Sequence, residues 1–178
     1  RLLTGAGRWL ALNDPRRFGS VDLVSGDPAV NFAPFATMGP EPLSDAFDVH
    51  SLAAAFAGRA APIKQLLLDQ RIVAGLGNIY VCEALFIAGI APTRSGRDVP
   101  RAALVRLVAA IKAVLIAAIA AGGSSLRDFV HPDGQLGYFS HAWRVYGREG
   151  QACTVCATPI ARLVQGGRST FHCLKCQK

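Results

Sequence analysis

Acidic residues and long apolar runs are both scarce in this sequence. Its 178 residues include 12 Asp and Glu against 19 Lys and Arg, and the resulting formal net charge of +7 favours polyanionic partners. The longest apolar stretch, residues 100–121, is interrupted by Arg101, Arg106 and Lys112. The part after Lys112 is about half the ~20 residues that a bilayer-spanning helix needs. We therefore predict a buried helix in a soluble protein that has no membrane partner.

An initiator methionine and a targeting signal are also missing. The chain opens with Arg1, and residues 8–12 already have the apolar character of a strand. Residues 1–36 as a whole are strand-like, with a turn at residues 5–7 and a second apolar run at residues 20–24. Two or three strands without a partner layer are marginally stable. We therefore expect this chain to be the back part of a longer protein.

Cysteine is rare except near the C-terminal end, where four of the five cysteines form two Cys-x-x-Cys pairs. Two such pairs at the ends of a β-hairpin supply the four thiolates of a closed, structural zinc site. Two disulfides are the alternative, but Cys-x-x-Cys pairs in a chain without a signal peptide favour metal. His172 receives a structural or surface role because four thiolates already fill the site, and Cys82 is assigned to the core. The predicted zinc ligands are Cys153, Cys156, Cys173 and Cys176.

The sequence around the predicted zinc site is basic. Between residues 144 and 178, Glu149 is the one acid against six basic residues. A four-thiolate zinc site would lower the net charge of the chain to +5, which is still basic. A zinc-stabilised basic hairpin is typical of nucleic-acid contacts. The six basic residues are Arg144, Arg148, Arg162, Arg168, Lys175 and Lys178.

Residues 43–121 have a helical pattern and follow a proline-rich linker. Asp48 or Ser51 can cap a first helix that ends at Phe56, and Pro62 can open a second helix. The polar, glycine-bearing stretch after the last helix, residues 124–138, is too long for an idle connection. The second, third and fourth helices are predicted at residues 63–68, 79–88 and 99–121.

The segment between the second and third predicted helices contains Gly75-Leu76-Gly77-Asn78. Its glycines permit sharp turns, and Asn78 is placed to cap the third helix. Free N–H groups at such a helix N-terminus can bind a phosphate. An ordinary helix cap explains the same pattern equally well, so the motif alone does not decide between the two.

Together with the four cysteines, this helix pair resembles the DNA-binding half of the formamidopyrimidine-DNA glycosylase and endonuclease VIII family. A helix-two-turn-helix also occurs in a ribosomal protein, but without this finger. The motif Asn13-Asp14-Pro15-Arg16-Arg17-Phe18-Gly19 is similar to that of the formamidopyrimidine branch. Further matches are Gly39-Pro40-Glu41-Pro42-Leu43, Gly122-Gly123-Ser124-Ser125-Leu126, Gly137-Tyr138-Phe139, Val145-Tyr146-Gly147-Arg148 and Arg168-Ser169-Thr170-Phe171.

The resemblance implies an α+β, multidomain fold. Residues 1–38 would be the remnant of an N-terminal catalytic β-sandwich. Residues 39–143 would form the helix-two-turn-helix domain, with a lesion-recognition loop at residues 123–138. Residues 144–178 would form a β-hairpin zinc finger with four cysteine ligands.

The resemblance also implies roles for individual side chains. Arg16 would fill the hole left by a flipped nucleotide and bond the orphaned cytosine, and Phe18 would wedge the adjoining base step. Arg168 would grip phosphates at the lesion and assist the δ-elimination step. The other implied phosphate contacts are Arg59, Lys64 and Asn78. In the loop over the flipped base, the implied base or phosphate contacts are Ser124, Ser125 and Arg127, and Tyr138 belongs to the same loop. For Arg59 and Lys64, a solvated surface position is the alternative.

By the same resemblance, the parent protein is a bifunctional DNA glycosylase and AP lyase for oxidised purines such as 8-oxoguanine and formamidopyrimidines. Its family uses an N-terminal proline amine to form a Schiff base, followed by β,δ-elimination. That proline, the glutamate after it and a lysine of the N-terminal domain cannot be located in this chain, where Glu41, Glu83 and Glu149 are isolated. We therefore expect this chain to bind DNA without cleaving it.

Three alternatives stay open at this point. The chain could belong to a catalytically inactive paralogue that binds damaged DNA, to an endonuclease VIII-like enzyme for oxidised pyrimidines, or to a ribosomal or transcription-associated zinc protein. The last alternative gives no role to Arg16 and Phe18. The favoured partner is double-stranded DNA containing oxidised bases, bound by a monomer in the bacterial cytoplasm at the nucleoid.

Overall fold

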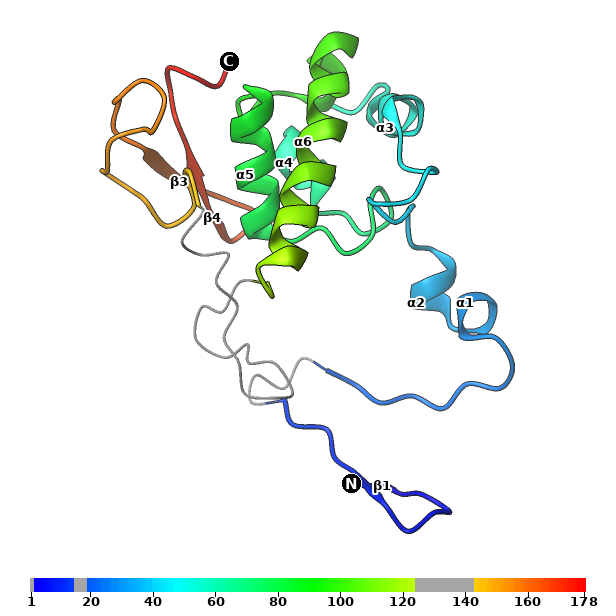
Figure 1. The fold of residues 1–178 in the computed structure, drawn as a ribbon. Coiled ribbons are helices and arrows are strands. Elements are labelled where there is room, and N and C mark those ends of the chain that lie inside the picture. Colours follow the sequence, from blue (N-terminus) through cyan, green and yellow to red (C-terminus); the bar gives the residue numbers. More distant parts are fainter. Residues whose placement is uncertain (1, 15–18, 124–142) are drawn as a thin grey trace. The chain divides into compact units, whose positions relative to one another are not determined.

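The computed structural model describes residues 2–14, 19–123 and 143–178 (Figure 1). The chain divides into two compact units, Arg1–Thr37 and Met38–Lys178. Both contain helices and short antiparallel β-ladders, so the predicted α+β class is confirmed.

The first unit begins with a small β-hairpin. Strands β1 (Leu2–Leu3) and β2 (Trp9–Leu10) pair antiparallel, with Leu2 opposite Leu10. The predicted turn between them is present, and Gly7 adopts a φ of 74° that suits glycine. The strand expected within residues 8–12 is therefore confirmed, although it is short.

The rest of the first unit differs from the prediction. Residues 20–24 were expected to form a strand, but they form none, and two short helices follow them. These are α1 (Pro28–Asn31) and α2 (Ala33–Ala36). The first of these helices has a clear local start signal. Asp27 accepts a hydrogen bond from the N–H of Ala29 at 2.9 Å, and Pro28 fixes the first helical φ. This start signal outweighs the strand-like composition of the segment.

The helices of the second unit follow the predicted order. The first has a complete capping box, because the side chain of Asp48 accepts from the N–H of Ser51 at 2.7 Å and the hydroxyl of Ser51 accepts from the N–H of Asp48 at 3.0 Å. The helices are α3 (Val49–Phe56), α4 (Ile63–Leu67), α5 (Asn78–Ala88) and α6 (Arg101–Ala120), and a short 3₁₀ turn, η1 (Gly96–Asp98), precedes α6.

The connection from α4 to α5 is anchored by a close backbone contact with the linker. The N–H of Gly39 donates to the carbonyl of Gln70 at 2.8 Å, and the N–H of Ala74 donates to the carbonyl of Pro40 at 3.1 Å. A Cβ atom on Gly39 would lie 2.6 Å from the carbonyl carbon of Ile72, so only glycine fits there. The linker thus fixes the two turns that lead into the N-terminus of α5.

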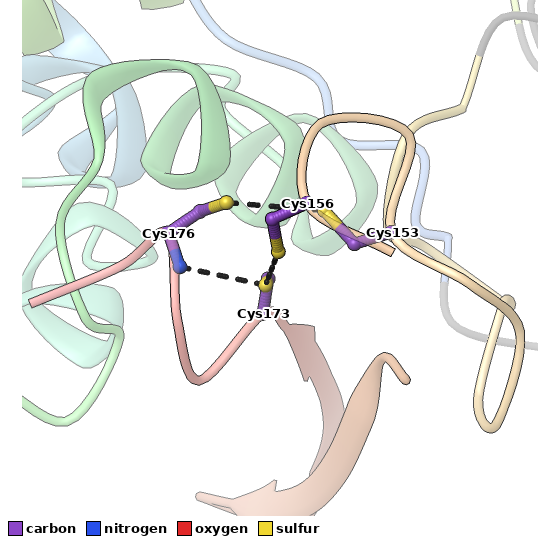
Figure 2. A group of neighbouring side chains, drawn as sticks. All are labelled: Cys153, Cys156, Cys173 and Cys176. Carbon is purple, nitrogen blue, oxygen red and sulfur yellow. Dashed lines mark hydrogen bonds between the residues drawn. The ribbon is translucent and has the colours of Figure 1, made fainter. Parts of the chain in front are cut away.

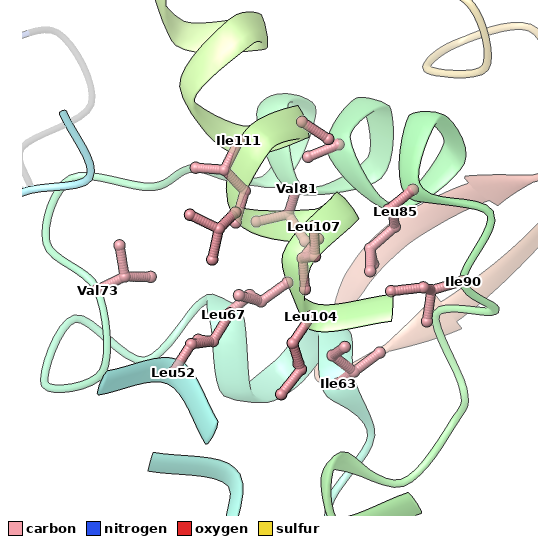
Figure 3. Packing of buried hydrophobic residues seen from close by; sticks show 14 of the residues in the cluster. Leu52, Ile63, Leu67, Val73, Val81, Leu85, Ile90, Leu104, Leu107 and Ile111 are labelled. Atoms are coloured by element: carbon pink, nitrogen blue, oxygen red, sulfur yellow. The ribbon is translucent and has the colours of Figure 1, made fainter. Parts of the chain in front are cut away.

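The hydrophobic core of the second unit lies between these four helices, as Figure 3 shows. Leu67, Leu85, Leu107 and Ile111 come from α4, α5 and α6 and are fully buried. Burial of each such side chain contributes about 1.5–3 kcal/mol. The core therefore holds α4 and α5 in a fixed relative position. Other labelled members are Leu52, Ile63, Val73, Val81, Ile90 and Leu104.

Helix α6 is long and apolar enough to cross a membrane by length and composition alone. It packs against α5 and α3 instead, and eight of its residues are buried in the core. The prediction of a buried helix at this position is confirmed. The buried residues are Ala103, Leu104, Leu107, Val108, Ala110, Ile111, Val114 and Ala118.

The C-terminal segment forms a second antiparallel hairpin beside α5 (Figure 1). Strand β3 (Ala161–Gln165) pairs with β4 (Arg168–His172), with Gln165 opposite Arg168. The connecting glycines, Gly166 and Gly167, both have positive φ values, 54° and 73°. A two-residue turn of this kind matches the twist of a hairpin.

Candidate nucleic-acid interface and metal centre

The four predicted zinc ligands come together at the open end of the β3–β4 hairpin, where β3 begins and β4 ends (Figure 2). Their Sγ atoms all lie within 4.8 Å of one another. Cys153 and Cys176 are 3.9 Å apart, and Cys156 and Cys173 are 3.4 Å apart, sulfur to sulfur. Thiolates around a tetrahedral Zn²⁺ at 2.3 Å are separated by about 3.8 Å. The arrangement therefore fits a closed four-thiolate zinc site.

Local hydrogen bonds reach the sulfur atoms of this cluster. The N–H of Val155 donates to the sulfur of Cys153, and the N–H of Cys176 donates to the sulfur of Cys173, both at 3.4 Å. Hydrogen bonds from the side chain and backbone of Thr158 lower the pKa of Cys156 to about 6. The sulfur of Cys156 in turn raises the pKa of Cys176 to about 12. A divalent cation bound by the four thiolates would offset their mutual repulsion.

The two remaining candidates near the metal centre have structural positions. His172 lies outside the group of four sulfurs and is 6% exposed, so its structural role is favoured over a surface one. Burial lowers the pKa of this imidazole. Cys82 is 1% exposed in α5 and packs in the cluster that contains Phe171 and Cys173. Its assignment to the core is confirmed.

Arg168 lies on the surface at the first position of β4, directly after the hairpin turn. The carbonyl of the next residue, Ser169, accepts two hydrogen bonds from the helical part of the unit. One comes from Nζ of Lys64 at 3.2 Å and the other from Nδ2 of Asn78 at 3.0 Å. Three of the residues implied as phosphate contacts, distant in sequence, therefore meet at one point on β4.

Lys64 is not a surface residue. Its side chain belongs to α4 and is fully buried, and Nζ also donates to Oγ1 of Thr170 at 2.7 Å. The solvated alternative is therefore wrong, because the partners of the ammonium group lie inside the protein. Burial lowers the pKa of Lys64, and the positive charge of Arg168 lowers it further.

Asn78 occupies the first turn of α5 but does not cap it. The N-cap position belongs to Gly77, and within the part of the chain that the structure describes no side chain caps the helix. The cap prediction was wrong because Nδ2 of Asn78 turns instead to Ser169 and to the hydroxyl of Tyr146, at 3.0 and 3.4 Å. Its Oδ1 is buried and has no hydrogen-bond partner among the described residues. Asn78 therefore couples the start of α5 to the finger.

Arg59 lies on the exposed connection between α3 and α4. Its backbone fixes the turn before α6, because the carbonyl accepts from the N–H of Arg97 at 3.0 Å and from Oγ of Ser95 at 3.3 Å. The side chain is thus available at the surface, and its phosphate contact stays a prediction. Arg16, Phe18, Ser124, Ser125, Arg127 and Tyr138 lie outside the described residues.

Glu83 is a key residue of this interface that the sequence did not reveal. It was described as isolated, yet the carboxylate is 2% exposed and accepts three backbone N–H groups at the start of the finger. These come from Arg144 at 2.8 Å, Val145 at 2.9 Å and Tyr146 at 2.8 Å. The sequence signal that could have indicated it is a single acid within the apolar α5, since an ionised group in such a place needs partners.

The glutamate contact positions an aromatic row. Tyr146 packs edge-on against Trp143 and Phe171, with ring centroids 5.1 and 5.0 Å apart. The hydroxyl of Tyr146 accepts a hydrogen bond from Nδ2 of Asn78. Glu83 and Asn78, both on α5, therefore hold the finger at two points, and the finger carries Arg168.

Comparisons with known proteins identify both parts of this interface. Residues 38–130 match the formamidopyrimidine-DNA glycosylase H2TH domain, and residues 150–178 match a zinc finger found in FPG and IleRS. The finger match, together with the four clustered sulfurs, confirms zinc as the predicted cofactor.

Similar proteins extend over nearly the whole chain. Formamidopyrimidine-DNA glycosylases from Sphingopyxis alaskensis and Rhizorhabdus wittichii are 66% and 61% identical over 99% of this chain. This chain spans 65% of the length of each.

Solved structures are similar too. The MutM (FPG) protein of Thermus thermophilus has 43% identity and a TM-score of 0.84, over 92% of this chain and 62% of its own. A complex of Lactococcus lactis Fpg with DNA containing an abasic site has 34% identity and a TM-score of 0.85, over 93% of this chain and 60% of its own. Because the H2TH match alone covers more than half of the residues, this chain belongs to the formamidopyrimidine-DNA glycosylase family.

Proposed function

We propose that this chain is the DNA-binding part of a base-excision-repair enzyme that removes oxidised purines and then cleaves the strand. The parent would be a bifunctional DNA glycosylase and AP lyase that flips 8-oxoguanine or a formamidopyrimidine, forms a Schiff base and carries out β,δ-elimination. The Lactococcus lactis relatives support this substrate class, since they were solved with Fapy-dG containing DNA and with abasic DNA. The parent would act as a monomer in the bacterial cytoplasm.

The observation that carries the proposal is the meeting of Lys64, Asn78 and Arg168 at the backbone of Ser169. The first two come from the two helices of the H2TH domain, and the third comes from the finger. A phosphate bound at this point would be held by both parts of the unit at once. Such a site grips the DNA backbone next to an extruded nucleotide without reading its sequence.

Each residue would have a definite task. The guanidinium of Arg168 would donate to phosphate oxygens, and by family resemblance it would assist δ-elimination. Arg59 would add a second exposed cation, and Lys64 would add positive charge from beneath the surface. The zinc ion, held by its four cysteines, would stabilise the hairpin that presents Arg168. Arg16 and Phe18 would fill the space left by the flipped nucleotide.

The binding part of the proposal is tested with the 178-residue chain and a short duplex that carries one abasic site. We expect weak binding that falls with salt, because the exposed Arg59 and Arg168 would displace counterions from about two phosphates. The slope of log K against log salt would then be about −2. Binding that does not respond to salt would contradict a phosphate-directed interface.

The catalytic part is tested by borohydride trapping on a duplex that contains 8-oxoguanine. The 178-residue chain should give no covalent adduct, because it contains no N-terminal proline amine. The full-length parent should give one. An adduct with the short chain would show that another amine is the nucleophile, whereas no adduct with the parent would identify an inactive paralogue.

A further inference from the structure

A closed ring of buried hydrogen bonds lies directly behind Arg168. Thr170 is fully buried in β4, and its hydroxyl accepts from Nζ of Lys64 at 2.7 Å and donates to Oε1 of Gln165 at 3.0 Å. Nε2 of Gln165 donates to the carbonyl of Pro92 at 3.2 Å, and the same carbonyl accepts from the backbone N–H of Lys64 at 3.4 Å. The ring therefore joins the hairpin to α4 and to the loop after α5.

The ring lies on the same face of the hairpin as Arg168. Gln165 and Arg168 are directly opposite each other in the ladder, and Thr170 follows Arg168 by two residues. In a pleated sheet such positions project to one face. Arg168 is thus an exposed member of a face on which Gln165 and Thr170 are buried and hydrogen-bonded.

The space beside Arg168 would allow a loose hairpin to move. A cavity of about 320 Å³ opens there, and its lining includes Asp69, Gln165 and Arg168. Asp69 already forms a salt bridge with Arg71 at 2.7 Å, so it does not need Arg168 as a partner. The position of Arg168 then depends on how firmly β4 is held rather than on a neighbouring acid.

The burial of Lys64 makes the hydrogen bonds of this ring energetically important. Among the described residues Lys64 forms no salt bridge, and its ammonium is bonded to a carbonyl and a hydroxyl. A buried cation with neutral partners is costly unless those hydrogen bonds are kept. The two cations also repel each other, and a bound phosphate would offset that repulsion.

We propose that Thr170 is a positioning residue whose hydroxyl bonds to the buried Lys64 and fixes β4, so that Arg168 faces the phosphate. This inference rests on the proposed DNA-binding function. It assigns to Thr170 no contact with DNA and no part in the metal site. The effect of Thr170 on DNA binding must then pass through Arg168.

The test is a double-mutant cycle on the 178-residue chain, with a duplex carrying one abasic site as the probe. Thr170→Val keeps the shape of the side chain and removes its hydroxyl, and we expect it to weaken binding about five- to tenfold. Thr170→Ser keeps the hydroxyl and should stay within about twofold of the unchanged protein. Arg168→Ala should weaken binding about tenfold. In the Arg168→Ala background, Thr170→Val should cause little further loss.

A control variant and two measurements of folding distinguish a positioning role of Thr170 from general loss of structure. Thr154→Val, at an exposed threonine of the same finger, is the matched control and should bind normally. Zinc content and the thermal melt report whether each variant is folded. If Thr170→Val does not fold, Gln165→Met opens the same ring from its other side, and we expect a loss of about threefold that again disappears without Arg168.

The outcomes are distinct. If Arg168→Ala binds as well as the unchanged protein, the proposed phosphate role of Arg168 fails, and this inference fails with it. If Arg168→Ala binds weakly but Thr170→Val does not, only the inference about Thr170 is overturned. Equal losses from Thr170→Val with and without Arg168 would also overturn it, because Thr170 would then act on the structure in general.

Discussion

Replacement of Glu83 by glutamine should destabilise the second unit by about 3 kcal/mol. The carboxylate accepts three backbone N–H groups at 2.8–2.9 Å, and two of them share Oε1. Glutamine can keep Oε1 for Val145 and Tyr146, but these bonds lose their charge assistance, at about 1 kcal/mol each. Its NH₂ group would face the N–H of Arg144, which leaves one donor unpaired for about another 1 kcal/mol. This loss is a large fraction of the stability of a typical domain.

Urea unfolding followed by tryptophan fluorescence measures this loss. The chain has two tryptophans, and Trp9 lies in the first unit, so a Trp9→Phe background leaves Trp143 as the reporter of the second unit. Glu149→Gln is the matched control, because Glu149 is exposed and its salt bridge with Arg162 is long, at 3.7 Å. The control should change the free energy of unfolding by less than about 0.5 kcal/mol.

If Glu83→Gln is no less stable than Glu149→Gln, the three hydrogen bonds do not secure the start of the finger. A loss of stability should also appear as weaker DNA binding, because Glu83 fixes Tyr146 and Tyr146 contacts Asn78. Loss of stability with unchanged binding would mean that the contact between Tyr146 and Asn78 does not matter for DNA.

Three further predictions concern the metal, the first unit and the turn before α5. Chelation of zinc should unfold the finger and abolish DNA binding, and an unchanged thermal melt in chelator would count against the zinc site. In the full-length protein, Arg16→Ala should reduce excision of 8-oxoguanine far more than it reduces nonspecific DNA affinity, whereas equal losses would make Arg16 a phosphate contact only. The hydrogen bond from Arg71 lowers the pKa of Asp69 to about 2, so its stabilising effect is complete above about pH 4 and is lost as the pH falls through 2. Because Arg71, the salt-bridge partner of Asp69, is exposed, Asp69→Asn should cost less than about 1 kcal/mol at neutral pH, and the two proteins should be equally stable below pH 2.

The parts of the fold that were predicted correctly depend on short-range patterns. The capping box at Asp48 and Ser51, and the glycine that ends α5, are signals within a few residues of the helix ends they define. The helices at Pro28 and Ala33 have a similar local signal in Asp27 and Pro28, but the apolar composition of the segment outweighed it in the prediction. That error was therefore avoidable from the sequence.

The contacts within the interface could not be predicted in the same way. Asn78 was expected to cap its own helix, yet its amide bonds to Ser169, 91 residues later in the chain. Glu83 was described as isolated, although its partners lie 61 to 63 residues away. No periodicity or spacing rule connects residues over such distances, and only the packing of the finger against α5 brings them together.

The sequence by itself determined the zinc ligands and the family. A Cys-x-x-Cys pair forms a metal-binding knuckle from four consecutive residues, so the identity of Cys153, Cys156, Cys173 and Cys176 follows from local chain geometry. The tertiary structure alone decided that Lys64 is buried. Its ammonium group meets Ser169 and Thr170 across more than a hundred residues, and the free energy of a buried cation depends on those partners rather than on its neighbours in sequence.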